Sequence, residues 1–187
     1  MNPDPKDRLR LFFALWPNVA ERTALAAWQA PLHALCGGRL MQMDTLHSTL
    51  VFLGEVEAHR LEALQLAAQE VSSPRFGWSL AEAHYWGHNH IVYAAPEIAP
   101  APLVELVDKL ERNLRKHHFH FDVRPYKPHV TLLRNAHWGD ASKIGDPLLS
   151  LPAVDWRVDD FVLVSSLNGA SSARYEVLAQ FPLSGEC

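Results

Sequence analysis

The order of apolar and polar residues predicts strands and helices along the whole chain. Runs of aliphatic and aromatic residues bounded by glycine, proline or asparagine are typical of β-strands. Such runs occur at Arg8–Trp16, Leu46–Leu53, Phe76–Ala83, His90–Ala95, Pro128–Leu133, Trp156–Leu167 and Tyr175–Leu183. Apolar residues spaced by three and four predict helices after Pro17-Asn18, over Glu57–Val71 and over Pro102–His117.

Short polar segments mark where these elements begin and end. We expect Asn18 to cap the first helix, Gly37-Gly38 to end it and Gly54 to stop the second strand. Turns are predicted at Gly87–Asn89 and Asn168–Ser172, and a loop at Trp138–Asp146.

This pattern predicts an α+β fold in which helices pack against largely antiparallel sheets. A helix followed by a strand with the sequence His-x-Thr-Leu occurs once in each half of the chain. We therefore expect two pseudo-symmetric lobes of antiparallel sheet, with outer helices, around a central cleft. No linker rich in glycine, serine or proline separates the halves, so residues 1–187 are interpreted as a single bilobal domain.

Composition narrows the class of protein. Of 187 residues, 48% are hydrophobic and 20% are charged, which is ordinary for a soluble globular protein. The apolar runs are too short to cross a bilayer and the N-terminus lacks a signal-peptide pattern, so we expect a cytoplasmic protein without membrane contact. Cys36 and Cys187 form neither a disulfide framework nor a metal-ligand pattern, and we expect the first to be buried and the second exposed.

Charge argues against a broad nucleic-acid surface. The formal net charge is −4, so wide electrostatic binding of nucleic acid is not expected. Cations nevertheless outnumber carboxylates between Lys109 and Arg134. Some of these cations belong to the solvated face of a helix, and the rest predict a local anion site.

Two segments carry the candidate chemistry, His47-Ser48-Thr49-Leu50 and His129-Val130-Thr131-Leu132. Because side chains alternate along a strand, each histidine points to the same face as the threonine two positions later. One imidazole can accept a proton from an attacking water while the other donates a proton to the departing oxygen. The hydroxyls can donate to non-bridging phosphate oxygens. A single copy would be explained by β propensity alone, but two copies favour a metal-independent phosphoesterase.

On these motifs the chain resembles the bacterial RNA 2′,3′-cyclic phosphodiesterases, also called 2′-5′ RNA ligases, of the two-histidine phosphoesterase superfamily. The paired His-x-Thr-Leu motifs are specific to the superfamily. The resemblance covers nearly the whole chain and is carried by Arg10–Leu15, His47–Glu55, Arg124–Arg134 and Tyr175–Leu178.

The resemblance implies hydrolysis of a terminal 2′,3′-cyclic phosphate to a 2′-phosphate without a metal or other cofactor. His47 would be the proton donor to the leaving 3′ oxygen and His129 the proton acceptor from water. Thr49 and Thr131 would bind the phosphate oxygens. Reversible 2′-5′ joining of RNA ends would use the same site. The expected partners are RNA ends or nucleoside 2′,3′-cyclic phosphates, and we expect a monomer with no obligate protein partner.

Other residues are candidates for substrate binding. Arg134 can clamp two phosphate oxygens, but alternation from His129 puts it on the wrong face unless the strand bulges near Leu133. Either Phe12 or Phe13 must face the cleft floor, where an aromatic ring could stack on the terminal base. We name Arg134 and Phe13 as candidates, with core packing the alternative for the phenylalanine. The clustered histidines lack zinc-site spacing, so no metal site is expected.

Two rival functions remain at this point. The same scaffold could hydrolyse a small cyclic nucleotide, or it could be an RNA-binding module without activity. The second is disfavoured, because a binding module has no need of two proton-transfer groups.

Overall fold

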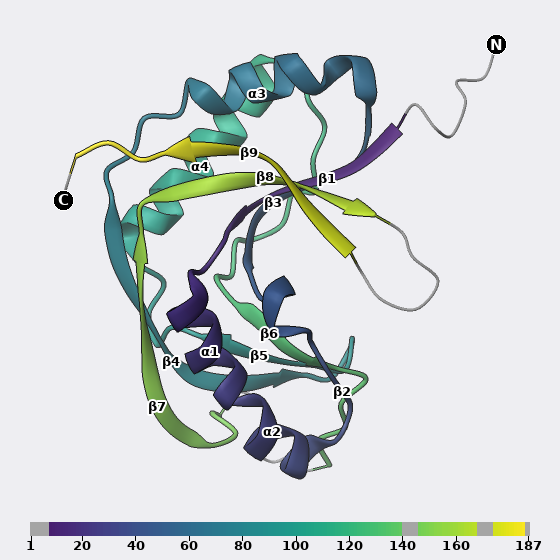
Figure 1. The fold of residues 1–187 in the computed structure, drawn as a ribbon, viewed down its shortest axis with the longest axis vertical. Helices are drawn as coiled ribbons and strands as arrows, with labels where there is room; N and C mark the ends of the chain where they lie inside the picture. Colours follow the sequence, from purple (N-terminus) through teal and green to yellow (C-terminus); the bar gives the residue numbers. More distant parts are fainter. Residues whose placement is uncertain (1–7, 140–145, 168–173, 186–187) are drawn as a thin grey trace.

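The computed structural model describes residues 8–139, 146–167 and 174–185. Within them the strands form two antiparallel sheets, one of four strands in the order β3-β1-β8-β9 and one of five in the order β2-β6-β5-β4-β7 (Figure 1). The four-stranded sheet contains β1 (Arg8–Leu15), β3 (Ser48–Glu57), β8 (Asp160–Leu167) and β9 (Arg174–Pro182). The five-stranded sheet contains β2 (Arg39–Leu40), β4 (Phe76–Trp86), β5 (Ile91–Ala95), β6 (Val130–Arg134) and β7 (Ser150–Val158).

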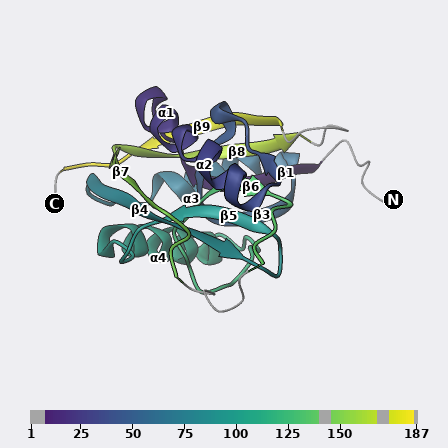
Figure 2. The same ribbon diagram turned by 90° about the horizontal axis from the view of Figure 1, so that it is seen from below.

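Each sheet is accompanied by its own pair of helices. The helices are α1 (Val19–Ala27), α2 (Gln29–Cys36), α3 (Leu61–Gln69) and α4 (Ala101–Lys116), with 3-10 turns η2 (Met43–Thr45) and η3 (Ala58–Arg60). α3 and α4 pack together beside the four-stranded sheet, and α1 and α2 contact β7 and β6 of the other sheet (Figure 1). Seen from below, β8 and β9 lie in one layer and β4 and β5 in another (Figure 2). The predicted α+β fold with two antiparallel lobes is confirmed.

One apolar core joins the two sheets. Its buried cluster includes Leu11 and Phe13 of β1, Leu80 of β4, Leu106 of α4 and Val130 of β6. Cys36 is buried in the same cluster, as expected, whereas Cys187 lies outside the described residues. No helix in the described part of the chain is long and apolar enough to span a membrane.

Several elements lie where the local sequence pattern predicted them. The predicted strand at Arg8–Trp16 is β1, and the predicted helix at Pro102–His117 is α4. Asn18 caps α1 as predicted, because its side chain accepts a hydrogen bond from the Glu21 amide at 3.0 Å while the Glu21 carboxylate accepts one from the Asn18 amide at 2.7 Å. This reciprocal capping box satisfies two amides that the helix leaves unpaired.

Two predicted boundaries were wrong. The helix after Asn18 is interrupted at Trp28 and continues as α2, because Pro31 has no amide hydrogen to donate to the carbonyl four residues earlier. β3 does not stop at Gly54 but runs on to Glu57. Gly54 instead adopts a φ of +72° beside a register shift against β1, a conformation that glycine adopts without a steric penalty.

Further differences concern the second half and the third helix. The run Trp156–Leu167 is two strands, because the chain leaves the five-stranded sheet after β7 and enters the four-stranded sheet as β8. Asp159 marks the crossing, and its carboxylate accepts a hydrogen bond from Arg157 at 3.1 Å. The helix predicted over Glu57–Val71 begins with η3 before α3. The predicted turn at 168–172 and residues 140–145 of the predicted loop lie outside the described residues.

Candidate active site

Both motif histidines stand immediately before a strand and are held in the same way. His47 precedes β3 and His129 precedes β6. The Nδ1 atom of each ring lies 2.7 Å from a backbone carbonyl oxygen two residues earlier, that of Thr45 or of Lys127. A carbonyl can only accept, so Nδ1 carries the hydrogen and donates. In the neutral ring this leaves Nε2 as the nitrogen available to accept a proton.

A β-bulge follows the threonine in both motifs. In the β1–β3 register, Ala14 pairs with Thr49 and Phe13 with Val51, so Leu50 is an extra residue on β3. In the β5–β6 register, Tyr93 pairs with Thr131 and Val92 with Leu133, so Leu132 is an extra residue on β6. A bulge shifts the alternation of side chains by one position. The residue three places after each threonine therefore returns to the face of the histidine.

These bulges bring the predicted residues into one cleft of about 630 Å³. His47, Thr49, His129 and Thr131 all line it. Arg134 lines it too, which meets the condition that the strand bulge near Leu133. The position equivalent to Arg134 in the first motif is Phe52, which also lines the cleft. The two walls thus share their histidines and threonines but differ in this residue.

The choice of Phe13 as a cleft residue was wrong. Phe13 is fully buried, and its ring centroid lies 6.0 Å from those of Phe161 and Phe181 in the main core. Phe12 lines the cleft instead, with its ring centroid 5.0 Å from that of His47. Successive side chains of a strand face opposite sides, and two adjacent phenylalanines give no sequence signal for which side is the core.

Aromatic rings surround both imidazoles, and none of these rings was predicted as a site residue. Trp16 stacks on His47 at 5.4 Å with an interplanar angle of 12°, and Tyr175 approaches edge-on at 5.2 Å. Trp86 and Tyr93 meet the ring of His129 at 4.7 and 5.7 Å, both at steep angles. These rings come from other strands or their ends, so only the sheet pairing brings them to the motifs.

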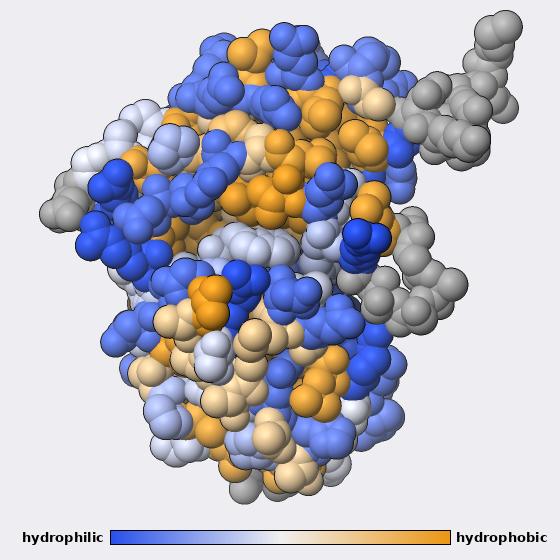
Figure 3. All heavy atoms as spheres, in the orientation of Figure 1, coloured by the Kyte–Doolittle hydropathy of each residue, from blue (hydrophilic) through white to orange (hydrophobic). Residues whose placement is uncertain are grey.

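On the face shown in Figure 3, apolar side chains gather over β8 and β9.

The cleft disfavours positive charge on both imidazoles. Burial lowers the pKa of His47 to about 4, and the nearby charges of His129 and Arg134 act in the same direction. Burial and Arg134 likewise lower the pKa of His129. The hydrogen bonds to the Thr45 and Lys127 carbonyls oppose these effects. A bound anion would favour the protonated rings, so the arrangement couples anion binding to proton uptake.

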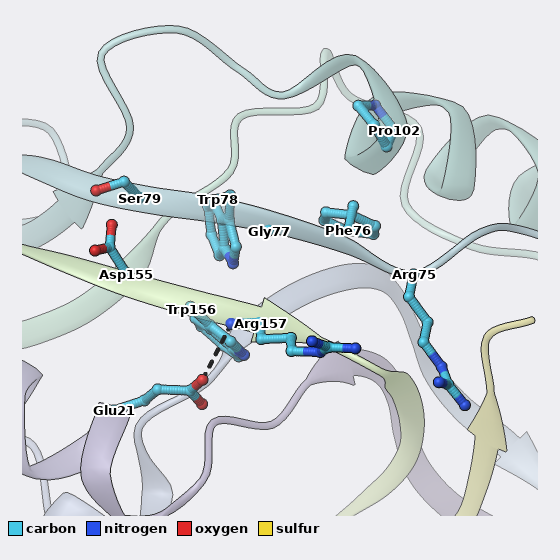
Figure 4. Close-up of a pocket in the computed structure, with 10 residues that line it drawn as sticks. All are labelled: Glu21, Arg75, Phe76, Gly77, Trp78, Ser79, Pro102, Asp155, Trp156 and Arg157. Atoms are coloured by element: carbon cyan, nitrogen blue, oxygen red, sulfur yellow. Dashed lines mark hydrogen bonds between the residues drawn. The ribbon is translucent and has the colours of Figure 1, made fainter. Parts of the chain in front are cut away.

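A second pocket of about 790 Å³ lies elsewhere and contains none of the predicted site residues. It is lined mainly by β4 and β7, with Trp78 and Trp156 packed against each other at 5.3 Å (Figure 4). Glu21 accepts a hydrogen bond from the Arg157 amide at 3.1 Å (Figure 4). The guanidiniums of Arg75 and Arg157 both lie within 4 Å of the Asp159 carboxylate. This pocket therefore presents no concentrated charge of one sign.

Comparison with known proteins agrees with this geometry. The chain is 32% identical over 174 residues, 93% of this chain and 96% of the relative, to the RNA 2',3'-cyclic phosphodiesterase of Escherichia coli strain K12. It is 28% identical to the protein of the same name from Thermus thermophilus, over 95% of this chain and 92% of the relative. The crystal structure of E. coli LigT complexed with 3'-AMP superposes with a TM-score of 0.81 at 31% identity, covering 95% of this chain and 99% of that one. The family model of the 2'-5' RNA ligase superfamily matches residues 15–170, and the chain belongs to that superfamily.

Proposed function

We propose that the protein hydrolyses the 2′,3′-cyclic phosphate at the end of an RNA to a 2′-phosphate. The observation that carries the proposal is the convergence of both His-x-Thr pairs and Arg134 on one cleft. The E. coli relative is named an RNA 2',3'-cyclic phosphodiesterase, and the similar LigT structure contains 3'-AMP. Both support a substrate of this class.

In the proposed reaction the two imidazoles move one proton each. Neutral His129 accepts a proton through Nε2 from a water whose oxygen attacks phosphorus. Protonated His47 donates its Nε2 proton to the ribose 3′ oxygen as the bond from phosphorus to that oxygen breaks. The products are a 2′-phosphate and a free 3′-hydroxyl. Acid and base on opposite walls suit the in-line geometry of phosphoryl transfer.

The remaining cleft residues stabilise the phosphate as charge redistributes. The hydroxyls of Thr49 and Thr131 donate hydrogen bonds to the non-bridging oxygens, and the guanidinium of Arg134 neutralises their charge. The phosphate anion also raises the pKa of both imidazoles above their values in the empty cleft. Substrate thereby supplies the charge that keeps His47 protonated.

The same arrangement serves 2′-5′ joining of RNA ends. A ribose 5′-hydroxyl takes the place of water, gives its proton to His129 and attacks phosphorus, and the 3′ oxygen leaves with the proton of His47. The reverse reaction regenerates the cyclic phosphate. Ligation is part of the proposal because it needs no further group.

The proposal is tested with a substrate panel and three variants. Phosphorus NMR would follow 2′,3′-cyclic AMP, an RNA trimer ending in a cyclic phosphate and an ADP-ribose cyclic phosphate. We expect opening of the first two, and loss of turnover in His47→Ala and His129→Ala. His59→Ala, whose side chain is 75% exposed, is the matched control. RNA binding that persists in both variants, with no turnover in the parent protein, would identify a binding module instead.

Three broader expectations stay predictions. A single domain over residues 1–187 is supported by the core shared between the sheets. A monomeric state is checked by size-exclusion chromatography, and a cytoplasmic location by cell fractionation.

A further inference from the structure

The cleft contains cations that the proposed chemistry does not use. Arg10, Arg124 and Lys127 line it in addition to Arg134. Arg124 is bound to the carboxylate of Asp122. Within the residues that the structure describes, neither Arg10 nor Lys127 has a carboxylate within 4.0 Å, and Glu55, opposite Arg10 on β3, also lies beyond that distance. Arg10 and Lys127 are therefore the cleft cations that can bind a second anionic group of the substrate.

Arg10 occupies a defined place relative to the catalytic histidine. It stands on β1 two residues before Phe12, whose ring contacts His47. Two residues along a strand span about 7 Å and restore the same face. Moving along β1 away from His47, the cleft thus presents Phe12 and then Arg10. Arg10 therefore lies beyond Phe12 as seen from His47, past the ring that contacts the imidazole.

The guanidinium of Arg10 is held in position by an aromatic ring. Its central carbon lies 5.0 Å from the centroid of Phe52. Phe52 is the residue that the bulge at Leu50 turns into the cleft, at the position taken by Arg134 on the opposite wall. A guanidinium stacked on a ring loses little further freedom when it binds an anion, and it can grip a phosphate through two hydrogen bonds.

We propose that Arg10, supported by Phe52, binds the 5′-phosphate of the terminal nucleotide, the phosphodiester that joins it to the rest of the RNA. This inference rests on the proposed function, because it places the cyclic phosphate between His47 and His129. An RNA end carries this second anion one step from the cyclic phosphate, whereas a nucleoside 2′,3′-cyclic phosphate lacks it. Arg10 is then the residue that makes the enzyme prefer RNA ends over free cyclic nucleotides.

Lys127 is the competing candidate for the same phosphate. It lies on the other wall, where its backbone carbonyl holds the ring of His129. Among the described residues, no aromatic ring lies over its ammonium. Its flexible side chain is therefore less well prepared to bind one particular oxygen pair.

The test compares two substrates that differ by one phosphate, adenosine 2′,3′-cyclic phosphate and its 5′-phosphorylated form. We expect the parent enzyme to prefer the second by about tenfold in kcat/KM, as for one charge-assisted contact. In Arg10→Gln this ratio falls to about one. Arg8→Gln, on the same strand but not lining the cleft, is the matched control and keeps the ratio. The ratio is the readout because a general loss of folding would lower both rates together.

Each other result overturns the inference in a recognisable way. Equal rates on both substrates in the parent enzyme would show turnover without any 5′-phosphate contact. An Arg10→Gln variant that keeps the preference, or a Lys127→Gln variant that loses it instead, would assign the contact elsewhere. If the parent enzyme opened neither substrate, the proposed function would fail first, and this inference with it.

Discussion

The buried His47 should make the stability of the empty enzyme depend on pH. In the unfolded chain its imidazole has an ordinary pKa of about 6.5, whereas burial in the cleft lowers the pKa to about 4. Between these values the unfolded chain binds the proton and the folded protein does not. The contribution of the neutral His47 to the free energy of unfolding is therefore fully present above pH 6.5 and is lost as the pH falls towards 4. At 1.36 kcal/mol for each pKa unit, the loss is about 3 kcal/mol.

The variant His47→Asn isolates this contribution. It removes the titrating ring, so the difference in unfolding free energy between parent and variant should shrink by about 3 kcal/mol from pH 7 to pH 4. Urea unfolding at a series of pH values measures the difference, and other titrating groups cancel because both proteins share them. His59→Asn, at an exposed position, is the matched control. Parallel curves for the parent and His47→Asn would show that the ring is not held neutral by burial.

Two further predictions concern activity and the core. Activity should persist in EDTA, and its dependence on pH should be bell-shaped. The bell for kcat should lie at higher pH than the bell for kcat/KM, because bound phosphate raises the pKa of both imidazoles. Coincident bells, or loss of activity on chelation, would contradict the mechanism. Phe13→Ala should lower the free energy of unfolding by about 3–5 kcal/mol, as for a fully buried phenylalanine; a urea midpoint close to that of the parent protein would contradict the core placement.

The candidate site could be located from sequence because its signal is local and repeated. His47 with Thr49, and His129 with Thr131, are linked by strand alternation over three residues, and that relation survived in the structure. Arg134 was the harder case, since its orientation depended on a bulge that could only be stated as a condition. The bulge at Leu132 meets that condition. The equivalent bulge at Leu50 turns Phe52 into the cleft, which the sequence did not predict.

Errors arose where the decisive contact came from a distant part of the chain. Phe12 and Phe13 are equivalent in the sequence, and only the core on one face of the sheet, where Phe13 meets Phe161 and Phe181, separates them. The apolar run 156–167 gave no sign that the chain changes sheets at Asp159. Trp16 and Tyr175 contact His47 because β1 and β9 belong to the same sheet as β3.

By itself the sequence determined the α+β class, the capping of α1 by Asn18 and the two strands that carry the histidines, because each depends on residues within a few positions of one another. The tertiary structure decided which side chains line the cleft, that burial lowers the pKa of both imidazoles, and where Arg10 meets the cleft. Those properties depend on strand register and burial, which are set by contacts between segments that are far apart in the chain.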